Sequence, residues 1–279
     1  MVVQHNLRAM NSNRMLGVTS NAQSKSTEKL SSGYKINRAA DDAAGLAISE
    51  KMRKQVRGLT KAVSNAQDGI SCVQTAEGAL NEIHDMLQRM NELAMQSANG
   101  TNSSKDRSAL DAEVQQLKSE VSRIANTVTF NDQFLLKGAN GAGTGSFSVN
   151  LQVGFNDADK IGLNIKAMNA TALSINGLSI ASATSAAGAI ASGGSISAAI
   201  QTVSDARAYL GAIQNRLEHT VNNLNNVVEN TQAAESQIRD TDMATEMVKY
   251  SNNNILAQAG TAMLAQSNQA NQNVLSLLG

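Results

Sequence analysis

Adjacent carboxylates and isolated histidines are the first residues in this sequence to suggest chemistry. Neighbouring carboxylates such as Asp41 and Asp42 can serve as general acid and base. These two directly precede an alanine-rich helix start, where carboxylates stabilise the positive end of the helix dipole. The three histidines, His5, His84 and His219, are far apart in the sequence. We therefore interpret the carboxylates as helix-stabilising and the histidines as surface or terminal residues.

The single cysteine and the motif content give no better catalytic candidate. Cys72 lies one position from an apolar seam described below, which favours a small packed residue over a nucleophile. The sequence has no HExxH zinc motif, no nucleophile elbow and no glycine-rich phosphate loop. We predict that the protein is not an enzyme, and that it has no catalytic residues, no metal and no cofactor.

Composition excludes further classes of function. Proline and tryptophan are absent, there are four Phe and three Tyr, and 23 basic residues balance 23 acidic ones. Without net positive charge or aromatic side chains, nucleic acid is not an expected partner. No apolar run approaches the ~18 residues of a membrane span, and the N-terminus lacks the apolar block of a cleaved secretory leader. The absence of proline favours long helices.

Residues 44–99 carry the strongest pattern in the chain. An apolar seam recurs every seven positions beside a second seam, and this spacing persists for about six heptads. The first seam consists of Met52, Leu59, Ala66, Val73, Leu80, Leu87 and Ala94. A helix of this length would extend roughly 84 Å at 1.5 Å per residue. A compact globule of the whole chain would have a radius of gyration of about 19 Å, so we expect an elongated molecule.

Shorter elements are predicted in the middle of the chain. After a turn at 98–102, a helix capped by Ser103 or Ser104 should run antiparallel to the long helix. Apolar and polar residues then alternate over 147–153 and 161–165, which predicts a β-hairpin. The Ala/Ser/Gly-rich segment 181–195 is predicted to be a loop.

The two chain ends differ from the middle of the chain. Heptad spacing returns near residue 196 and continues to about 249, which predicts a second long helix. Beyond 249 there is no charged side chain, and the first 27 residues contain no acidic one. Helices with such weak apolar stripes are marginal in isolation. We expect both ends to be disordered in the free chain and to order only against partners.

Several motifs, taken in order, resemble those of bacterial flagellins. They lie at residues 30–37, 40–48, 74–80, 91–94, 235–244 and 273–278. The resemblance covers residues 1–180 and 196–279. It implies a mainly α fold: an elongated antiparallel helical coiled-coil rod with a small β-hairpin, and both chain ends pairing as an inner helical domain.

The resemblance also implies a division of the chain into five segments. Residues 1–43 and 250–279 would form the inner helical domain, and residues 44–180 and 196–249 the rod domain. The loop at 181–195 would replace the variable outer domains of larger relatives.

A structural function follows from the same resemblance. It implies a subunit that polymerises into the bacterial flagellar filament for swimming, exported by the flagellar type III apparatus and located outside the cell. The implied partners are further copies of the chain, an export chaperone, and filament cap and hook-junction proteins. One alternative is a hook–filament junction or other minor axial protein, which shares similar ends. A soluble signalling coiled coil is an alternative of another class.

One surface on the long helix matches positions through which flagellins pack between subunits and contact a vertebrate Toll-like receptor. These positions are Gln88, Arg89, Glu92, Leu93 and Glu113. Arg89 is one position from the Met90 seam, so it should point sideways out of the bundle, close to Glu92. Glu113 should approach from the antiparallel helix, and Leu93 should add an exposed apolar contact.

A second surface is expected in the C-terminal segment, which the resemblance assigns to polymerisation and chaperone binding. Its candidate residues are Ile255, Met263, Val274, Leu275, Leu277 and Leu278.

Overall fold

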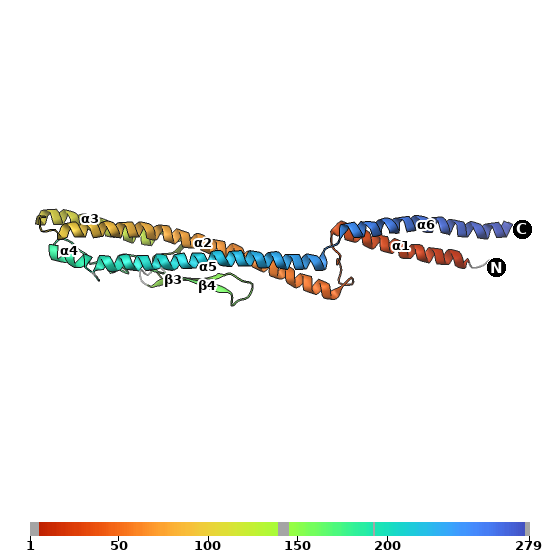
Figure 1. The fold of residues 1–279 in the computed structure, drawn as a ribbon, viewed down its shortest axis with the longest axis horizontal. Coiled ribbons are helices and arrows are strands. Elements are labelled where there is room, and N and C mark those ends of the chain that lie inside the picture. The colour runs from red at the N-terminus through yellow and green to blue at the C-terminus, as the bar shows by residue number, and fades with distance from the viewer. Residues whose placement is uncertain (1–5, 139–144, 192, 277–279) are drawn as a thin grey trace. The chain divides into compact units, whose positions relative to one another are not determined.

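The computed structural model describes residues 6–138, 145–191 and 193–276, and its contacts divide the chain into two units. The chain-end unit comprises the described parts of Met1–Val56 and Glu229–Gly279, and the central unit is Arg57–Val228. Figure 1 shows the order of the elements. They are α1 (Leu7–Ser32), α2 (Ala43–Ala98), α3 (Ser104–Thr127), β1 (Thr129–Phe130), β2 (Gln133–Phe134), β3 (Ser146–Gln152), β4 (Lys160–Lys166), α4 (Ala183–Ile190), α5 (Ser195–Arg239) and α6 (Met243–Ser276).

The predicted long helix and its antiparallel neighbour are confirmed. Helix α2 is continuous, and α3 begins with a capping box in which the side chains of Ser103 and Asp106 each accept a hydrogen bond from the other's backbone N–H. Hydrogen bonding from Ser103 lowers the pKa of the Asp106 carboxyl group. The Arg107 guanidinium donates to the Ser97 carbonyl at 2.9 Å, which joins the start of α3 to the end of α2.

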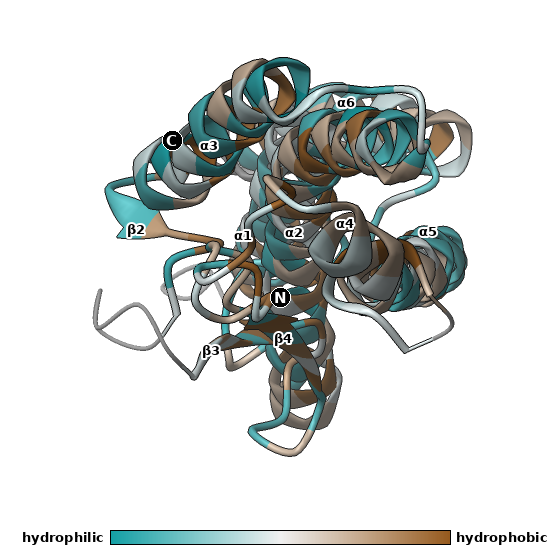
Figure 2. Cartoon of the chain, turned by 90° about the vertical axis from the view of Figure 1, so that its left-hand side faces the viewer, coloured by the Kyte–Doolittle hydropathy of each residue, from teal (hydrophilic) through white to brown (hydrophobic). Residues whose placement is uncertain are grey.

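The core of the central unit is built from apolar stripes of α2, α3 and α5 and from the inner face of a hairpin. Figure 2 shows hydrophobic and hydrophilic residues interspersed along the ribbons of the helices. The largest fully buried side chains are Leu80, Ile83, Leu87, Met90, Leu93, Leu135, Leu136, Leu163, Ile165, Met168, Ile175 and Ile180. Cys72 belongs to this core, and desolvation raises the pKa of its thiol, as expected for a packed residue.

The predicted hairpin is formed by β3 and β4, which pair antiparallel over seven residues. Ile161, Leu163 and Ile165 are buried, and the alternate residues of β4 are exposed. The alternation seen in the sequence therefore reflects a strand with one face against the core.

The segment 181–195 contains a helix, so its prediction as a loop is wrong. Ser182 caps α4 by accepting a hydrogen bond from the Ser185 N–H at 3.1 Å. Ala186 and Ala189 are buried in the core cluster. Alanine has the highest intrinsic helix propensity. Together with the burial of one face of α4, this propensity explains why a segment of low sequence complexity forms a helix.

The predicted C-terminal helix over 196–249 is interrupted. Helix α5 ends at Arg239, and α6 begins at Met243. The Asp242 side chain accepts hydrogen bonds from the N–H groups of Ala244 at 3.0 Å and Thr245 at 3.2 Å, and so caps the new helix. The Asp242 cap therefore separates α5 from α6, although the seven-residue apolar repeat continues through residues 239–243.

The chain ends are helical and paired, so the expected disorder is wrong for the described residues. Helix α1 runs antiparallel to α6: Asn6 contacts Ser267, and Ser26 contacts Glu246. A Cβ added at Gly260 would lie 3.3 Å from the Leu16 side chain, so the two helices approach closely there. Each end is the partner that orders the other, which confirms the predicted pairing of the chain ends.

Candidate interaction surfaces

Arg89 lies at the centre of an exposed ion-pair cluster that joins α2 to α3. Its guanidinium donates to the Glu113 carboxylate through Nε at 3.1 Å and to Glu92 through Nη1 at 3.2 Å. The hydrogen bond and charge of Glu113, followed by those of Glu92, raise the pKa of Arg89. The two ion pairs hold the guanidinium in one place. Because the side chain is 51% exposed, it remains accessible to a binding partner. The predicted orientation of these three residues is confirmed.

Leu93 departs from the predicted surface because it is only 1% exposed. The irregular segment that follows β4, residues 167–182, lies against this end of α2 and α3. The Ser97 hydroxyl donates to the Ile180 carbonyl, and the Gln115 amide donates to the Leu178 carbonyl. The two apolar seams of the long helix do not predict this additional contact. The exposed apolar side chain nearby is Met95, 56% exposed and seven residues after Gln88, hence on the same helix face.

Gln88 and the three histidines are the other polar candidates. Gln88 is exposed and lies 2.8 Å from a ring nitrogen of His84. His219 is exposed on α5, and His5 lies outside the described residues. Across the described ranges, no group of His, Cys, Asp and Glu could hold a metal ion, and no helix is long and apolar enough to cross a membrane.

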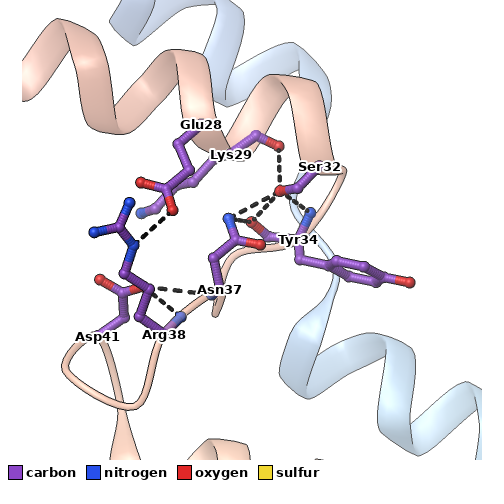
Figure 3. Close-up of polar contacts among 7 residues, drawn as sticks. All are labelled: Glu28, Lys29, Ser32, Tyr34, Asn37, Arg38 and Asp41. Carbon is purple, nitrogen blue, oxygen red and sulfur yellow. Dashed lines mark hydrogen bonds and ion pairs between the residues drawn. The ribbon is translucent and has the colours of Figure 1, made fainter.

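The Asp41–Asp42 pair organises the loop between α1 and α2. Asp42 accepts a hydrogen bond from the Gly45 N–H at 2.9 Å, near the start of α2, as predicted for a helix-stabilising carboxylate. Asp41 accepts from the N–H of Arg38 at 3.1 Å, and this bond is the main cause of its lowered pKa. Figure 3 shows the contacts of Asp41 with this loop and the ion pair between Arg38 and Glu28.

A joint between this loop and the α5–α6 connection was missed by the sequence analysis. The Arg239 guanidinium lies 4.4 Å from the centre of the Tyr34 ring and pairs with Glu50. Backbone hydrogen bonds run from the Lys35 N–H to the Arg239 carbonyl and from the Thr241 N–H to the Gly33 carbonyl. The sequence feature that could have indicated this joint is the run of polar residues at 239–242, inside the motif at 235–244.

The paired chain ends carry large apolar side chains that are exposed in the described part of the unit. We call them the end-pair apolar face: Leu7, Met10, Met15 and Val18 of α1, with Met243, Met247, Val248, Ile255, Leu256 and Met263 of α6. Their exposed fractions range from 48% at Met243 to 69% at Leu7. Of the predicted C-terminal candidates, Ile255 and Met263 belong to this face. Val274 and Leu275 lie in α6 with side chains outside the described part, and Leu277 and Leu278 lie outside the described residues.

The register of the end pair is fixed by a buried polar contact. Ser26 is 5% exposed, and its hydroxyl donates to the Glu246 carboxylate at 2.7 Å. Lys249 contacts the other oxygen of the same carboxylate at 3.3 Å. Burial acts to raise the pKa of Glu246, but the contacts with Ser26 and Lys249 and the charge of Lys29 outweigh it, so the pKa is lowered.

We expect the end pair to weaken in acid through Glu246. A lowered pKa stabilises the folded pair above the ordinary value of about 4.3, and this stabilisation is lost as the pH falls through the folded value. Glu246→Gln keeps the shape but removes the charge, so amide hydrogen exchange in α1 should be about five- to tenfold faster than in wild type at pH 7. The difference between variant and wild type should vanish in acid. A difference that persists unchanged at a pH where the Glu246 carboxylate is protonated in the folded chain would exclude the carboxylate as its cause.

These features define a class: a helical structural subunit with paired chain ends, an exposed apolar face and no catalytic constellation among the described residues. The family profile for the bacterial flagellin N-terminal helical region matches residues 3–141, and that for the C-terminal helical region matches 194–278. The chain therefore belongs to the bacterial flagellin family, and it is a structural subunit of the flagellar filament and not an enzyme.

Individual relatives agree with the family profiles. The chain is 52% identical to a flagellin of Halalkalibacterium halodurans and 46% identical to a flagellin of Bacillus subtilis, in both cases over the full length of both chains. Among solved structures it resembles the Bacillus cereus flagellin, at 34% identity and a TM-score of 0.50, covering 58% of this chain and 88% of that one. Full-length matches to relatives of similar size fit a short flagellin without outer domains.

Proposed function

We propose that this flagellin assembles its filament through the end-pair apolar face. The observation that carries the proposal is the concentration of exposed large apolar side chains on the chain-end unit. A concentration of large exposed apolar side chains in one unit of a protein favours an interaction surface there. One such contact repeated between copies without closure generates a helical filament. We propose that residues 1–43 and 250–279 act as the inner helical domain, which extends to the start of α6 at Met243. Residues 44–180 and the rest of 196–249 then act as the rod.

The same face requires protection before assembly. The end of α6 is the proposed binding site of an export chaperone, with Ile255 and Met263 as exposed contacts and Val274, Leu275, Leu277 and Leu278 completing the segment. Filament cap and hook-junction proteins are the further partners proposed for the polymerising chain. The proposed route is the flagellar type III apparatus, without a cleaved leader, to the extracellular filament.

The Arg89 cluster is the proposed contact for the Toll-like receptor that senses flagellin. The support is its geometry: an exposed guanidinium held by Glu92 and Glu113, with Gln88 beside it. Arginine in such a setting is a frequent centre of binding energy in protein interfaces. The buried Leu93 can act only by supporting this surface, and we assign the apolar contact to Met95 instead.

Arg89→Ala is expected to weaken binding of the monomer to the receptor ectodomain by about tenfold or more. The monomer should remain folded, because the side chain is exposed and makes only surface ion pairs. Surface plasmon resonance would measure the affinity, with circular dichroism as the folding control. Arg123→Ala is the matched control, because it removes a comparable exposed arginine that pairs with Glu120 on α3. Its affinity for the receptor should equal that of wild type. Equal affinity of wild type and a folded Arg89→Ala variant would refute the assignment.

A further inference from the structure

Half of the end-pair apolar face consists of methionine. Its five methionines are Met10, Met15, Met243, Met247 and Met263, and they are 48–64% exposed. Met90 and Met168, in the core of the central unit, are fully buried. The thioethers of the end-pair apolar face and those of Met90 and Met168 therefore differ sharply in their access to solvent.

These five methionines lie among the side chains assigned to subunit contacts. On α1, Met10 and Met15 fall with Leu7 and Val18 within an arc of about 140°, at 100° per residue. On α6, Met263 follows Ile255 by eight residues and Leu256 by seven, so the three share one side of the helix. A chemical change at these sulfur atoms would alter the surface that meets the next subunit.

We propose that these five methionines are sites of reversible oxidation by hydrogen peroxide, and that their oxidation in the free subunit blocks its addition to a filament. The inference rests on the proposed assembly through the end-pair apolar face. In the reaction the thioether sulfur attacks one peroxide oxygen, the O–O bond breaks and an S–O bond forms. The other oxygen leaves as water once protons are transferred. Sulfur loses two electrons and the peroxide gains them.

The physical effect of the reaction is a change in polarity. Methionine sulfoxide is polar, whereas the thioether is apolar and adaptable. Burying the sulfoxide oxygen between subunits without a hydrogen-bond donor carries a desolvation cost that the thioether does not. Within an assembled filament the same side chains would be covered, so oxidation should act on the monomer and spare the polymer. Sulfoxide reductases of both stereospecificities, supplied with a thiol, restore the thioether.

The test compares growth from filament seeds before and after peroxide treatment of the monomer. Mass spectrometry of peptides should show that the five exposed methionines are oxidised at least about tenfold faster than Met90 and Met168. Seeded growth of the oxidised monomer, followed by light scattering, should slow by about tenfold or more and recover after reductase treatment. Circular dichroism should show an unchanged helix content.

Two variants separate the proposal from the assumption on which it rests. In a variant with Met10→Leu, Met15→Leu, Met243→Leu, Met247→Leu and Met263→Leu, peroxide treatment should leave the growth rate at the variant's own untreated value. Met95→Leu, which removes an exposed methionine of the central unit, should stay as sensitive as wild type. Full growth of wild type with all five sites oxidised would overturn the proposal, as would a failure of the reductases to restore growth. Normal growth of the unoxidised Ile255→Asp variant would instead overturn the assembly surface itself.

Discussion

Leu217→Asp should lower the free energy of unfolding by about 3–5 kcal/mol, since it places an unpaired carboxylate in the core. Leu217 lies on α5, is 0% exposed and belongs to the main apolar cluster of the central unit. The buried residues that form this cluster with it are uncharged. The carboxylate must either remain charged without solvent or take up a proton, and both options cost free energy at neutral pH.

Asn222→Asp is the matched control for this substitution. It introduces the same side chain five residues further along α5, at an exposed position. Its effect on the free energy of unfolding should stay within about 0.5 kcal/mol. Urea unfolding followed by circular dichroism would measure both variants. Similar midpoints for the two would show that the seam does not face the core.

Ile255→Asp is expected to abolish seeded filament growth while leaving the monomer intact. Ile255 is 61% exposed in the chain-end unit, so a carboxylate there remains solvated in the free chain. Burial of that carboxylate between subunits would cost several kcal/mol, and about 3 kcal/mol already corresponds to more than a hundredfold weaker addition of each subunit.

Light scattering and negative-stain electron microscopy would measure filament growth of Ile255→Asp against Asn222→Asp. The control carries the same charge outside the end-pair apolar face and should grow as wild type does. Growth of both variants at the same rate would remove Ile255 from the assembly surface.

Elements with a strong local signal were predictable from the sequence. The heptads of α2, the capping serine of α3 and the alternation in β3 and β4 each reflect one face packed against a core. Such periodicity survives in the residue order, because every turn of helix or pair of strand residues must repeat the same apolar contact. The exposed position of Arg89 followed from its place beside the Met90 seam.

Features that depend on contacts distant in sequence were not predictable from periodicity. The break between α5 and α6 lies inside a continuing apolar repeat and is set by the Asp242 cap and by the contact of Arg239 with Tyr34. The pairing of α1 with α6 depends on Ser26 and Glu246, two polar residues that no apolar pattern can identify. Leu93 is buried because the segment 167–182 packs at this end of α2, in addition to α3 and α5. The two apolar seams of α2 do not predict contact with such a segment.

The most direct measurement is a cryo-electron microscopy reconstruction of filaments grown from the purified chain on seeds. We expect long helical filaments in which Ile255, Met263 and the rest of the end-pair apolar face are buried against neighbouring subunits. We also expect α1 and α6 to remain paired within each subunit. Filaments that leave this face open to solvent, or a purified chain that forms only closed oligomers, would refute assembly through this face.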